Sequence, residues 1–204
     1  MTAQPHQYMI EEEYLAFERS STTKHEYYAG RIYAMTGAKE PHNLIAGNLV
    51  AAFHPQLRRK PCRVYASDMR IKVVTTGLNT YPDIVIVCGQ PQFTDAVRDT
   101  ITNPIVLVEI LSASTERYDR GMKFEHYRTI STLCDYILVA QDRHHVEHFA
   151  RQEGGLWVFQ EATHASAELY IPSIDCTLKL EDMYEKVDFE EGVSEITREI
   201  LPDE

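Results

Sequence analysis

Two acidic residues lie inside apolar runs, where a charge is costly. Asp83 follows Pro82 at the start of a run that ends at Cys88, and Glu109 lies near the end of residues 104–111. Nearly continuous apolar runs of this length are typical of central strands that are buried on both faces. A protein tolerates a buried carboxylate when it is paired or binds a metal. These two residues are therefore the first candidates for chemistry.

Carboxylates on neighbouring strands offer the oxygen ligands that Mg²⁺ or Mn²⁺ prefers. Asp83 and Glu109 would hold one ion and leave positions for water and a substrate phosphate. The third element is a lysine that can meet the attacking water, and the segment after the second acid supplies Lys123. Arg120 and Tyr127, three residues before it and four after it, share its helix face. This set predicts metal-dependent hydrolysis of a phosphodiester bond.

The elements around these residues place them at one end of a sheet. Hydroxyl residues at 112–115 can cap a helix that runs through Ile130, and residues 134–140 return as an apolar strand. Upstream, we expect a core helix that begins near His42 and that Pro55 kinks or ends early.

Several further elements complete the predicted architecture. We expect a short helix over residues 10–17 and a hairpin over residues 25–35, with Glu26 on its first arm and its turn at Ala29-Gly30. Residues 63–74 contain an extended pair of short runs that should form an outer or half-exposed strand, and residues 146–159 should form a hairpin joined by Gly154-Gly155.

At this point the residues match a known pattern. The sequence resembles the Uma-type restriction endonuclease family, common in cyanobacterial genomes, in the order Glu26, Pro82-Asp83, Glu109-Ile110-Leu111-Ser112, Lys123 and Tyr127. The resemblance covers roughly Tyr14 to Val187. It implies a branch of the P-D…(D/E)-x-K nuclease superfamily, whose core is a helix, three strands, a second helix and a fourth strand. The element order expected above from His42 to Ala140 is the same.

The resemblance implies an α/β (α+β) fold with a restriction-endonuclease-like core, in which helices flank a central mixed sheet and hairpins are added. It also implies that the backbone carbonyl of Ile110 is a further metal ligand and that Glu26 is an accessory acid. The superfamily places its lysine two positions after the second acid, where this chain has Leu111. Lys123 on the following helix would be the replacement. Related nucleases cut DNA as homodimers, so DNA and a second copy are the expected partners.

Each assignment has a structural alternative. Asp83 could form a turn at a strand end, Glu109 and Lys123 could be a structural ion pair, and Glu26 could be a cross-strand surface partner. Position alone suggests three residues for phosphate or DNA contacts, namely His42, Arg120 and Tyr127. His42 could equally cap or pack at the start of its helix.

The composition narrows the class of protein. The 204 residues predict one domain over residues 1–187, followed by an acidic tail at 188–204 that keeps Val193, Ile196 and Ile200 at helical spacing. No apolar run is long enough for a membrane span, and the four cysteines form no C-x-x-C pair, so we expect a cytoplasmic protein with reduced thiols. A net charge of -11 excludes a broad basic surface for nucleic acid, so any DNA contact must be local.

Two other function classes remain open. The first is a non-catalytic interaction module on a nuclease scaffold, which Leu111 and the net charge favour. The second is a small-ligand or metal-storing protein that uses the cluster His144-His145-Val146-Glu147-His148. On a strand, His144 and His148 would share a face that His145 does not, and no remote partner is evident, so a half-exposed hairpin is the favoured interpretation.

Overall fold

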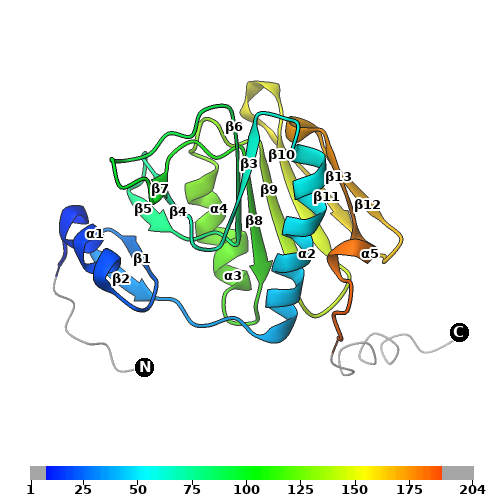
Figure 1. The fold of residues 1–204 in the computed structure, drawn as a ribbon, viewed down its shortest axis with the longest axis horizontal. Helices are drawn as coiled ribbons and strands as arrows, with labels where there is room; N and C mark the ends of the chain where they lie inside the picture. Colours follow the sequence, from blue (N-terminus) through cyan, green and yellow to red (C-terminus); the bar gives the residue numbers. More distant parts are fainter. Residues whose placement is uncertain (1–7, 190–204) are drawn as a thin grey trace, which may run out of the picture.

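The computed structural model describes residues 8–189, and its centre is a six-stranded mixed sheet in the order β11-β10-β9-β8-β6-β3 (Figure 1). Its strands are β3 (Cys62–Ala66), β6 (Ile84–Cys88), β8 (Val106–Leu111), β9 (Asp135–Ala140), β10 (Val146–Arg151) and β11 (Trp157–Ala162). β8 and β9 are parallel, and the other neighbours are antiparallel. β6 and β8 lie in the interior of the sheet and are buried almost throughout, as their apolar runs predict.

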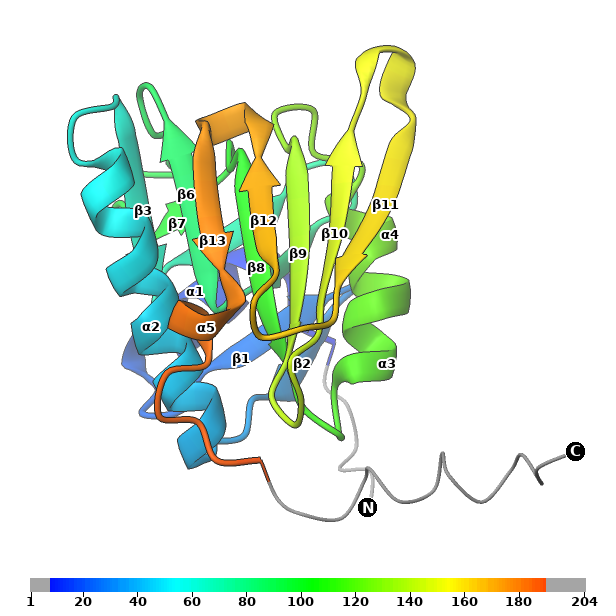
Figure 2. The ribbon, with the colours of Figure 1, turned by 90° about the vertical axis from the view of Figure 1, so that its right-hand side faces the viewer.

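Each face of this sheet has its own core. One face packs against α2 (Glu40–Leu57), against the hairpin of β12 (Glu168–Ile171) and β13 (Cys176–Lys179), and against α5 (Leu180–Met183) (Figure 2). The other face packs against α4 (Phe124–Tyr127) and a second, smaller sheet. On β8, Val108 and Ile110 face the first core, whereas Leu107 and Leu111 face the second. Because side chains alternate along a strand, Glu109 also points to the second face.

The smaller sheet has the order β2-β1-β5-β4-β7 and lies beside the central sheet, together with α1 (Glu11–Ser20) (Figure 1). Its strands are β1 (His25–Tyr28), β2 (Arg31–Ala34), β4 (Arg70–Val73), β5 (Leu78–Thr80) and β7 (Thr100–Ile101). The predicted hairpin is confirmed, with Ala29 and Gly30 both at positive φ in its two-residue turn. β1 carries Glu26 toward the central sheet.

A helical segment follows β8, as expected, but it is not one regular helix. It begins as α3 (Glu116–Tyr118), passes through a π-helical turn η1 (Asp119–Lys123), and ends as α4. Lys123 is the last residue of the π turn. The predicted order of a helix, three strands, a helix and a strand is therefore present as α2, β3, β6, β8, this segment and β9.

Two local expectations are only partly confirmed. Pro55 lies within α2 but does not end it early, because it lies in the last turn, where only the carbonyl of Ala51 loses its amide partner and Ala51 is exposed to water. Arg63 to Val74 contains the expected pair of short strands, and β3 is the partly exposed edge of the central sheet, but β4 is an interior strand of the smaller sheet and is mostly buried.

The expectation of four reduced thiols is also wrong for one pair. Cys62 and Cys88 are directly opposite each other on β3 and β6 and form a disulfide, with their Cα atoms 3.9 Å apart. The sequence could not show this proximity, because it arises only when the two strands pair in this register. Cys134 and Cys176 are free.

No helix within residues 8–189 has the length and apolar character required to cross a membrane. The predicted helix around Val193, Ile196 and Ile200 lies outside the described residues.

Candidate active site

The antiparallel register of β6 and β8 brings the two predicted metal ligands together. Ile84 is opposite Val108, so Asp83, one residue before β6, is next to Glu109. The Asp83 Oδ2 atom accepts a 2.7 Å hydrogen bond from the backbone amide of Ile110. This bond orients the Asp83 carboxylate toward the end of β8. The amide of Ile110 thus has an observed role, whereas its carbonyl as a metal ligand stays a prediction.

Lys123 is the centre of a buried charge cluster. Its Nζ atom lies 2.9 Å from Glu109 Oε1, 3.3 Å from Asp119 Oδ1 and 3.5 Å from Glu26 Oε1. The side chain is only 4% exposed. The helix after β8 therefore supplies a lysine to the acid on β8, although the chain has Leu111 at the position where the superfamily has its lysine.

Tyrosine hydroxyls complete the surroundings of the carboxylates. Tyr127, fully buried on α4, donates a 2.7 Å hydrogen bond to Glu109 Oε1. Tyr118 donates a 3.0 Å hydrogen bond to Glu26 Oε2, and Thr80 donates to the other oxygen of Glu26. Glu26 is therefore held by the smaller sheet and by the helix at the same time, and it is not a surface residue of the hairpin.

The charges of this cluster do not balance. Three carboxylates surround one ammonium group, and Asp83 lies beside them. Burial raises the pKa of the Glu109 carboxyl well above its ordinary value, and Lys123 opposes that shift. Burial likewise raises the pKa of Asp119, again opposed by Lys123. For Lys123, burial lowers the pKa, but the attraction of Glu109 and the other acids outweighs it, so the ammonium pKa lies well above its usual value.

The sequence did not single out Asp119 or Tyr118 as site residues. Asp119 lies near the start of the expected helix, where a negative charge is common for stability alone. Its spacing of four residues from Lys123 was the available signal. Tyr118 carried no signal, because its partner Glu26 is 92 residues away in the chain.

His42 lies in the first turn of α2 and joins the site from the opposite face of the sheet. Its Nε2 atom is 3.2 Å from Asp83 Oδ1, and both side chains are partly exposed. Its Nδ1 atom is buried without a hydrogen-bond partner among the described residues. His42 therefore contacts the first acid directly, and a phosphate contact stays a prediction.

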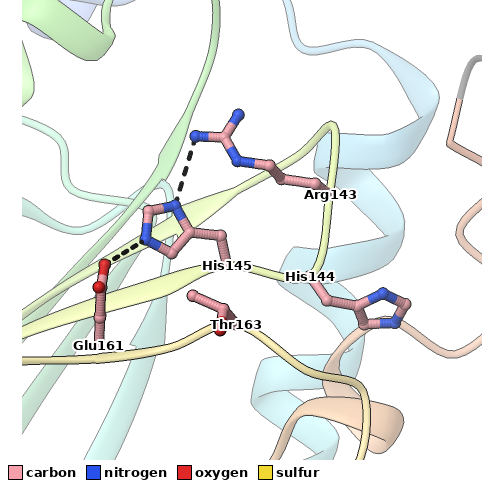
Figure 3. Close-up of a pocket in the computed structure, with 5 residues that line it drawn as sticks. All are labelled: Arg143, His144, His145, Glu161 and Thr163. Atoms are coloured by element: carbon pink, nitrogen blue, oxygen red, sulfur yellow. Dashed lines mark hydrogen bonds and ion pairs between the residues drawn. The ribbon is translucent and has the colours of Figure 1, made fainter. Parts of the chain in front are cut away.

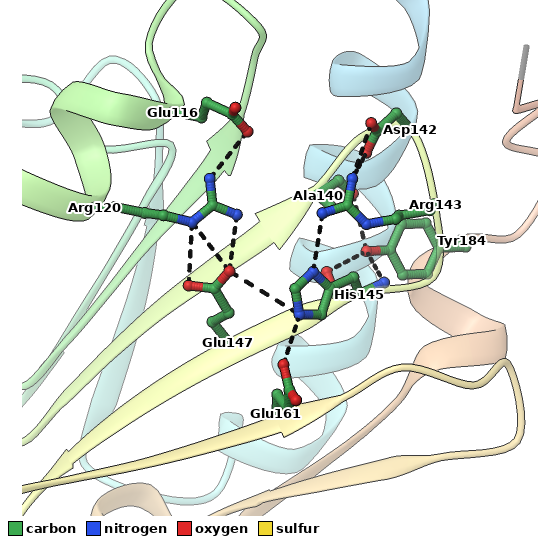
Figure 4. Close-up of polar contacts among 9 residues, drawn as sticks. All are labelled: Glu116, Arg120, Ala140, Asp142, Arg143, His145, Glu147, Glu161 and Tyr184. Carbon is green, nitrogen blue, oxygen red and sulfur yellow. Dashed lines mark hydrogen bonds and ion pairs between the residues drawn. The ribbon is translucent and has the colours of Figure 1, made fainter. Parts of the chain in front are cut away.

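The other two residues suggested for DNA contacts have protein partners. Figure 4 shows Arg120 between Glu147 and Glu116: its Nη2 atom lies 2.8 Å from Glu147 Oε1, and its Nη1 atom lies 2.9 Å from Glu116 Oε2. Tyr127 has no exposed surface and binds Glu109. Arg120 braces the π turn against β10, and Tyr127 orients a carboxylate.

The histidine cluster does not converge on one point. His144 lies in the loop before β10 and packs on the rings of Tyr184 and Phe189, and His145 pairs with Glu161 at 3.0 Å. His148 is fully buried, with Nε2 2.6 Å from Asp135 Oδ1. A pocket of about 400 Å³ beside this loop is lined by Arg143, His144, His145, Glu161 and Thr163 (Figure 3), and it contains none of the predicted catalytic residues.

The donor set at Asp83 and Glu109 fits a divalent cation on charge grounds. Among residues 8–189, every partner of the Glu109 carboxylate approaches Oε1, so Oε2 is the oxygen that can take a cation. The uncompensated negative charge has the sign that a cation neutralises. No three His, Cys, Asp or Glu side chains in the same range are grouped to hold a metal. A resident ion would therefore depend on two carboxylates, a backbone carbonyl, and water or substrate oxygens.

Comparison with known proteins identifies the family of the chain. The family model described as "Uma2: Putative restriction endonuclease" matches residues 11–194. The Synechocystis sp. proteins sll1609 and slr1290, both described as uncharacterized, are 32% and 35% identical; they align with 77% and 87% of this chain and with 89% and 92% of their own lengths.

A similar fold is found in a crystal structure described as a putative nuclease belonging to DUF820 from Anabaena variabilis. The TM-score is 0.70 at 17% identity, and the match covers 85% of this chain and 96% of that one. The fold is thus restriction-endonuclease-like, as expected.

Proposed function

Because this chain belongs to the Uma2 family of restriction-endonuclease-like proteins, we propose that it is a metal-dependent endonuclease that hydrolyses DNA phosphodiester bonds. One observation carries the proposal: Lys123 Nζ lies 2.9 Å from Glu109, and Glu109 is opposite Asp83 at the end of the central strands. An acid pair with an adjacent lysine is the donor set of a hydrolytic metal site, and here the lysine comes from the helix.

The residues of the chain have separable roles in this proposal. Asp83 and Glu109 bind Mg²⁺ or Mn²⁺, with the carbonyl of Ile110 as a further ligand. A bound ion would polarise the scissile phosphate and lower the pKa of a water molecule. Lys123 orients that water and stabilises the charge that develops on the phosphate. Glu26, from the smaller sheet, is an accessory acid that holds Lys123. We also propose a homodimer, by analogy with related nucleases that cut both DNA strands as homodimers.

Variants of the lysine test the proposal. Lys123→Arg preserves the charge but replaces a compact donor with a planar, bulkier one, so the water is misplaced and cleavage falls by on the order of 100-fold while metal affinity is kept. Lys72→Arg is the matched control, because Lys72 forms a 2.6 Å pair with Glu11 outside the site. A Lys123→Arg protein that cleaves plasmid and linear DNA at the parental rate would remove the role of Lys123.

A double variant asks whether the lysine has moved between elements. Leu111→Lys in a Lys123→Ala background restores a lysine two residues after Glu109, on the face that already packs against α4. Recovery of Mn²⁺-dependent cleavage above the level of Lys123→Ala alone would support the hypothesis that Lys123 replaces the lysine that the superfamily has at position 111. Divalent-ion binding that is unchanged by Asp83→Ala would contradict the metal site itself.

A non-catalytic binding module is the second candidate. Two observations favour it: the net charge of -11 and the burial of Lys123 among carboxylates. Under this alternative, the purified protein binds DNA or a protein partner with no cleavage of supercoiled, linear or single-stranded DNA at any Mg²⁺ or Mn²⁺ concentration.

A further inference from the structure

Asp119 contacts Lys123 but lies outside the proposed metal pair. Its Oδ1 atom is 3.3 Å from Lys123 Nζ, and both residues belong to the π turn η1. The side chain is 3% exposed. A buried carboxylate that does not bind the metal needs another explanation, and among residues 8–189 its only ion-pair partner is Lys123.

Lys123 and a divalent ion would compete for the same acid. Glu109 is the nearest carboxylate to Nζ and is also a proposed metal ligand. When Glu109 donates electron density to a cation, its attraction for the ammonium decreases, and the cation itself repels Nζ. Lys123 then stays beside the metal pair only if acids outside that pair hold it, and Asp119, at 3.3 Å, is nearer to Nζ than Glu26, at 3.5 Å.

The backbone fixes Asp119 for this purpose. Its amide donates to the carbonyl of Thr115 at 2.9 Å, and its carbonyl accepts a 3.0 Å hydrogen bond from Tyr136 on β9. Asp119 is therefore tied to the central sheet independently of the metal ligands.

The π turn aligns the residues that share this face. In an α-helix, residues four apart drift by about 40° around the axis, so residues 119, 123 and 127 would progressively leave the sheet. The π turn η1 takes up an additional residue and reduces this drift. As a result, Asp119 reaches Lys123, while both Lys123 and Tyr127 reach Glu109.

We infer that Asp119 is a positioning residue that retains the Lys123 ammonium at the site when Glu109 binds the divalent ion. The inference rests on the proposed function and adds a residue to it. Glu109 then gives up part of its contact with Lys123, and Asp119 keeps the ammonium within reach of the water and the phosphate.

Cleavage kinetics provide the first test. Asp119→Asn keeps the size of the side chain and removes its charge; we expect kcat to fall about 10- to 100-fold, with KM and Mg²⁺ affinity close to parental values. Asp119→Glu restores the carboxylate and should recover much of kcat. The matched control is Glu116→Gln, which removes an i,i+4 carboxylate on the same helical segment, 2.9 Å from Arg120 and exposed to solvent.

Amine labelling gives a readout that does not depend on activity. Acetic anhydride labelling followed by peptide mass analysis measures how accessible Lys123 is, with Lys72 as the internal reference. Lys123 should be protected in the parent with and without Mg²⁺. In Asp119→Asn it should stay protected without the ion and become labelled with Mg²⁺.

The outcomes separate the two claims. Parental kcat in Asp119→Asn, together with Mg²⁺-independent protection of Lys123, overturns the inference and leaves the proposed function intact. Absence of Mg²⁺ binding and of DNA cleavage in the parent overturns both.

Discussion

The protein buries two clusters of charge, one in each sheet region, and they differ in how the charges are balanced. In the smaller sheet, Arg70 is 2% exposed and lies 3.1 Å from Asp99, while Thr100 and Tyr81 accept its remaining hydrogen bonds. Beside the central sheet, Lys123 alone faces Glu26, Glu109 and Asp119. One cluster pairs cations with acids and neutral hydroxyls, whereas the other has more acids than cations.

The carboxyl pKa values move in opposite directions in the two clusters. A hydrogen bond from Arg19 lowers the pKa of Asp99 to about 2, against the effect of burial. The same arginine lowers the pKa of Asp95. At the other cluster, burial raises the pKa of Glu109 and Asp119, and Lys123 does not offset it.

The comparison distinguishes a structural ion network around Arg70 from the cluster around Lys123, which we propose as a metal site. A balanced network stabilises the fold by itself, because each acid gains a partner on folding. An unbalanced cluster costs folding free energy, which the surrounding cores must supply, and it becomes favourable when a cation binds. Four substitutions or additions test this distinction, ordered from the largest expected effect to the smallest.

Glu109→Gln should give the largest change. The amide keeps the shape but is a poor ligand for a hard cation, so DNA cleavage should fall by on the order of 10³-fold. The free energy of unfolding without metal should stay the same or rise, because one surplus negative charge is removed. Chemical denaturation and a cleavage assay measure the two quantities. If the variant is less stable than the parent but Mg²⁺ still raises its free energy of unfolding by the same amount, Glu109 has a structural role and is not a metal ligand.

Arg70→Met should have the opposite pattern: the protein loses stability but keeps its metal binding. Removal of the buried cation leaves Thr100 and Tyr81 without their hydrogen-bond donor and leaves Asp99 with Arg19 alone, so the free energy of unfolding should fall by about 3 kcal/mol. Mg²⁺ should stabilise the folded variant as much as the parent. Arg63→Met is the matched control, because Arg63 is exposed on β3. Urea denaturation would contradict the comparison if both variants lost equal stability.

Mg²⁺ itself should stabilise the parent protein by relieving the surplus charge. At about 100 times its dissociation constant, a ligand that binds only the folded state adds about 2.7 kcal/mol. We expect a matching rise in Tm for the parent and none for Asp83→Asn. A scan with Ca²⁺ and Na⁺ as controls shows whether the effect needs a divalent ion. Equal shifts in parent and variant would place the binding elsewhere.

Asp99→Asn should have the smallest effect. Asp99 and its nearer partner Arg19 are both partly exposed to water, so the loss at pH 7 should not exceed about 1 kcal/mol. Because the folded pKa is lowered from 3.8 to about 2, this contribution is present above pH 3.8 and disappears as the pH falls toward 2. The contribution of Glu109 to stability changes with pH in the opposite direction, because its raised pKa makes the metal-free protein less stable as the pH rises. Unfolding curves measured between pH 2 and 8 check both signs.

Much of the fold followed from patterns local in sequence. The apolar runs predicted β6 and β8, the Ala29-Gly30 pair predicted a hairpin, and the helix after β8 was expected in its place. The division into two sheets was not predicted. Residues 63–74 contribute strands to both sheets, and periodicity cannot show which neighbour a strand pairs with.

The site was predictable where chemistry and strand pattern coincide. Asp83, Glu109 and Lys123 were named from the cost of a buried charge and from the resemblance, and the structure brings them together. Asp119 and the disulfide between Cys62 and Cys88 were missed, because their roles depend on a π turn and on strand register. Neither feature has a sequence signature of its own.

The contacts of Glu26 bear on when the site forms during folding. It accepts a hydrogen bond from Thr80, 54 residues later, and from Tyr118, 92 residues later. Contacts so distant in sequence form slowly, because the chain must first close long loops. We therefore predict that, when exchange labelling is applied during refolding, amide protons of the β1–β2 hairpin become protected later than those of β8 and β9; simultaneous protection would contradict this order. A chain still being synthesised then lacks the assembled carboxylate cluster, and cleavage activity would begin only after the N-terminal hairpin has docked.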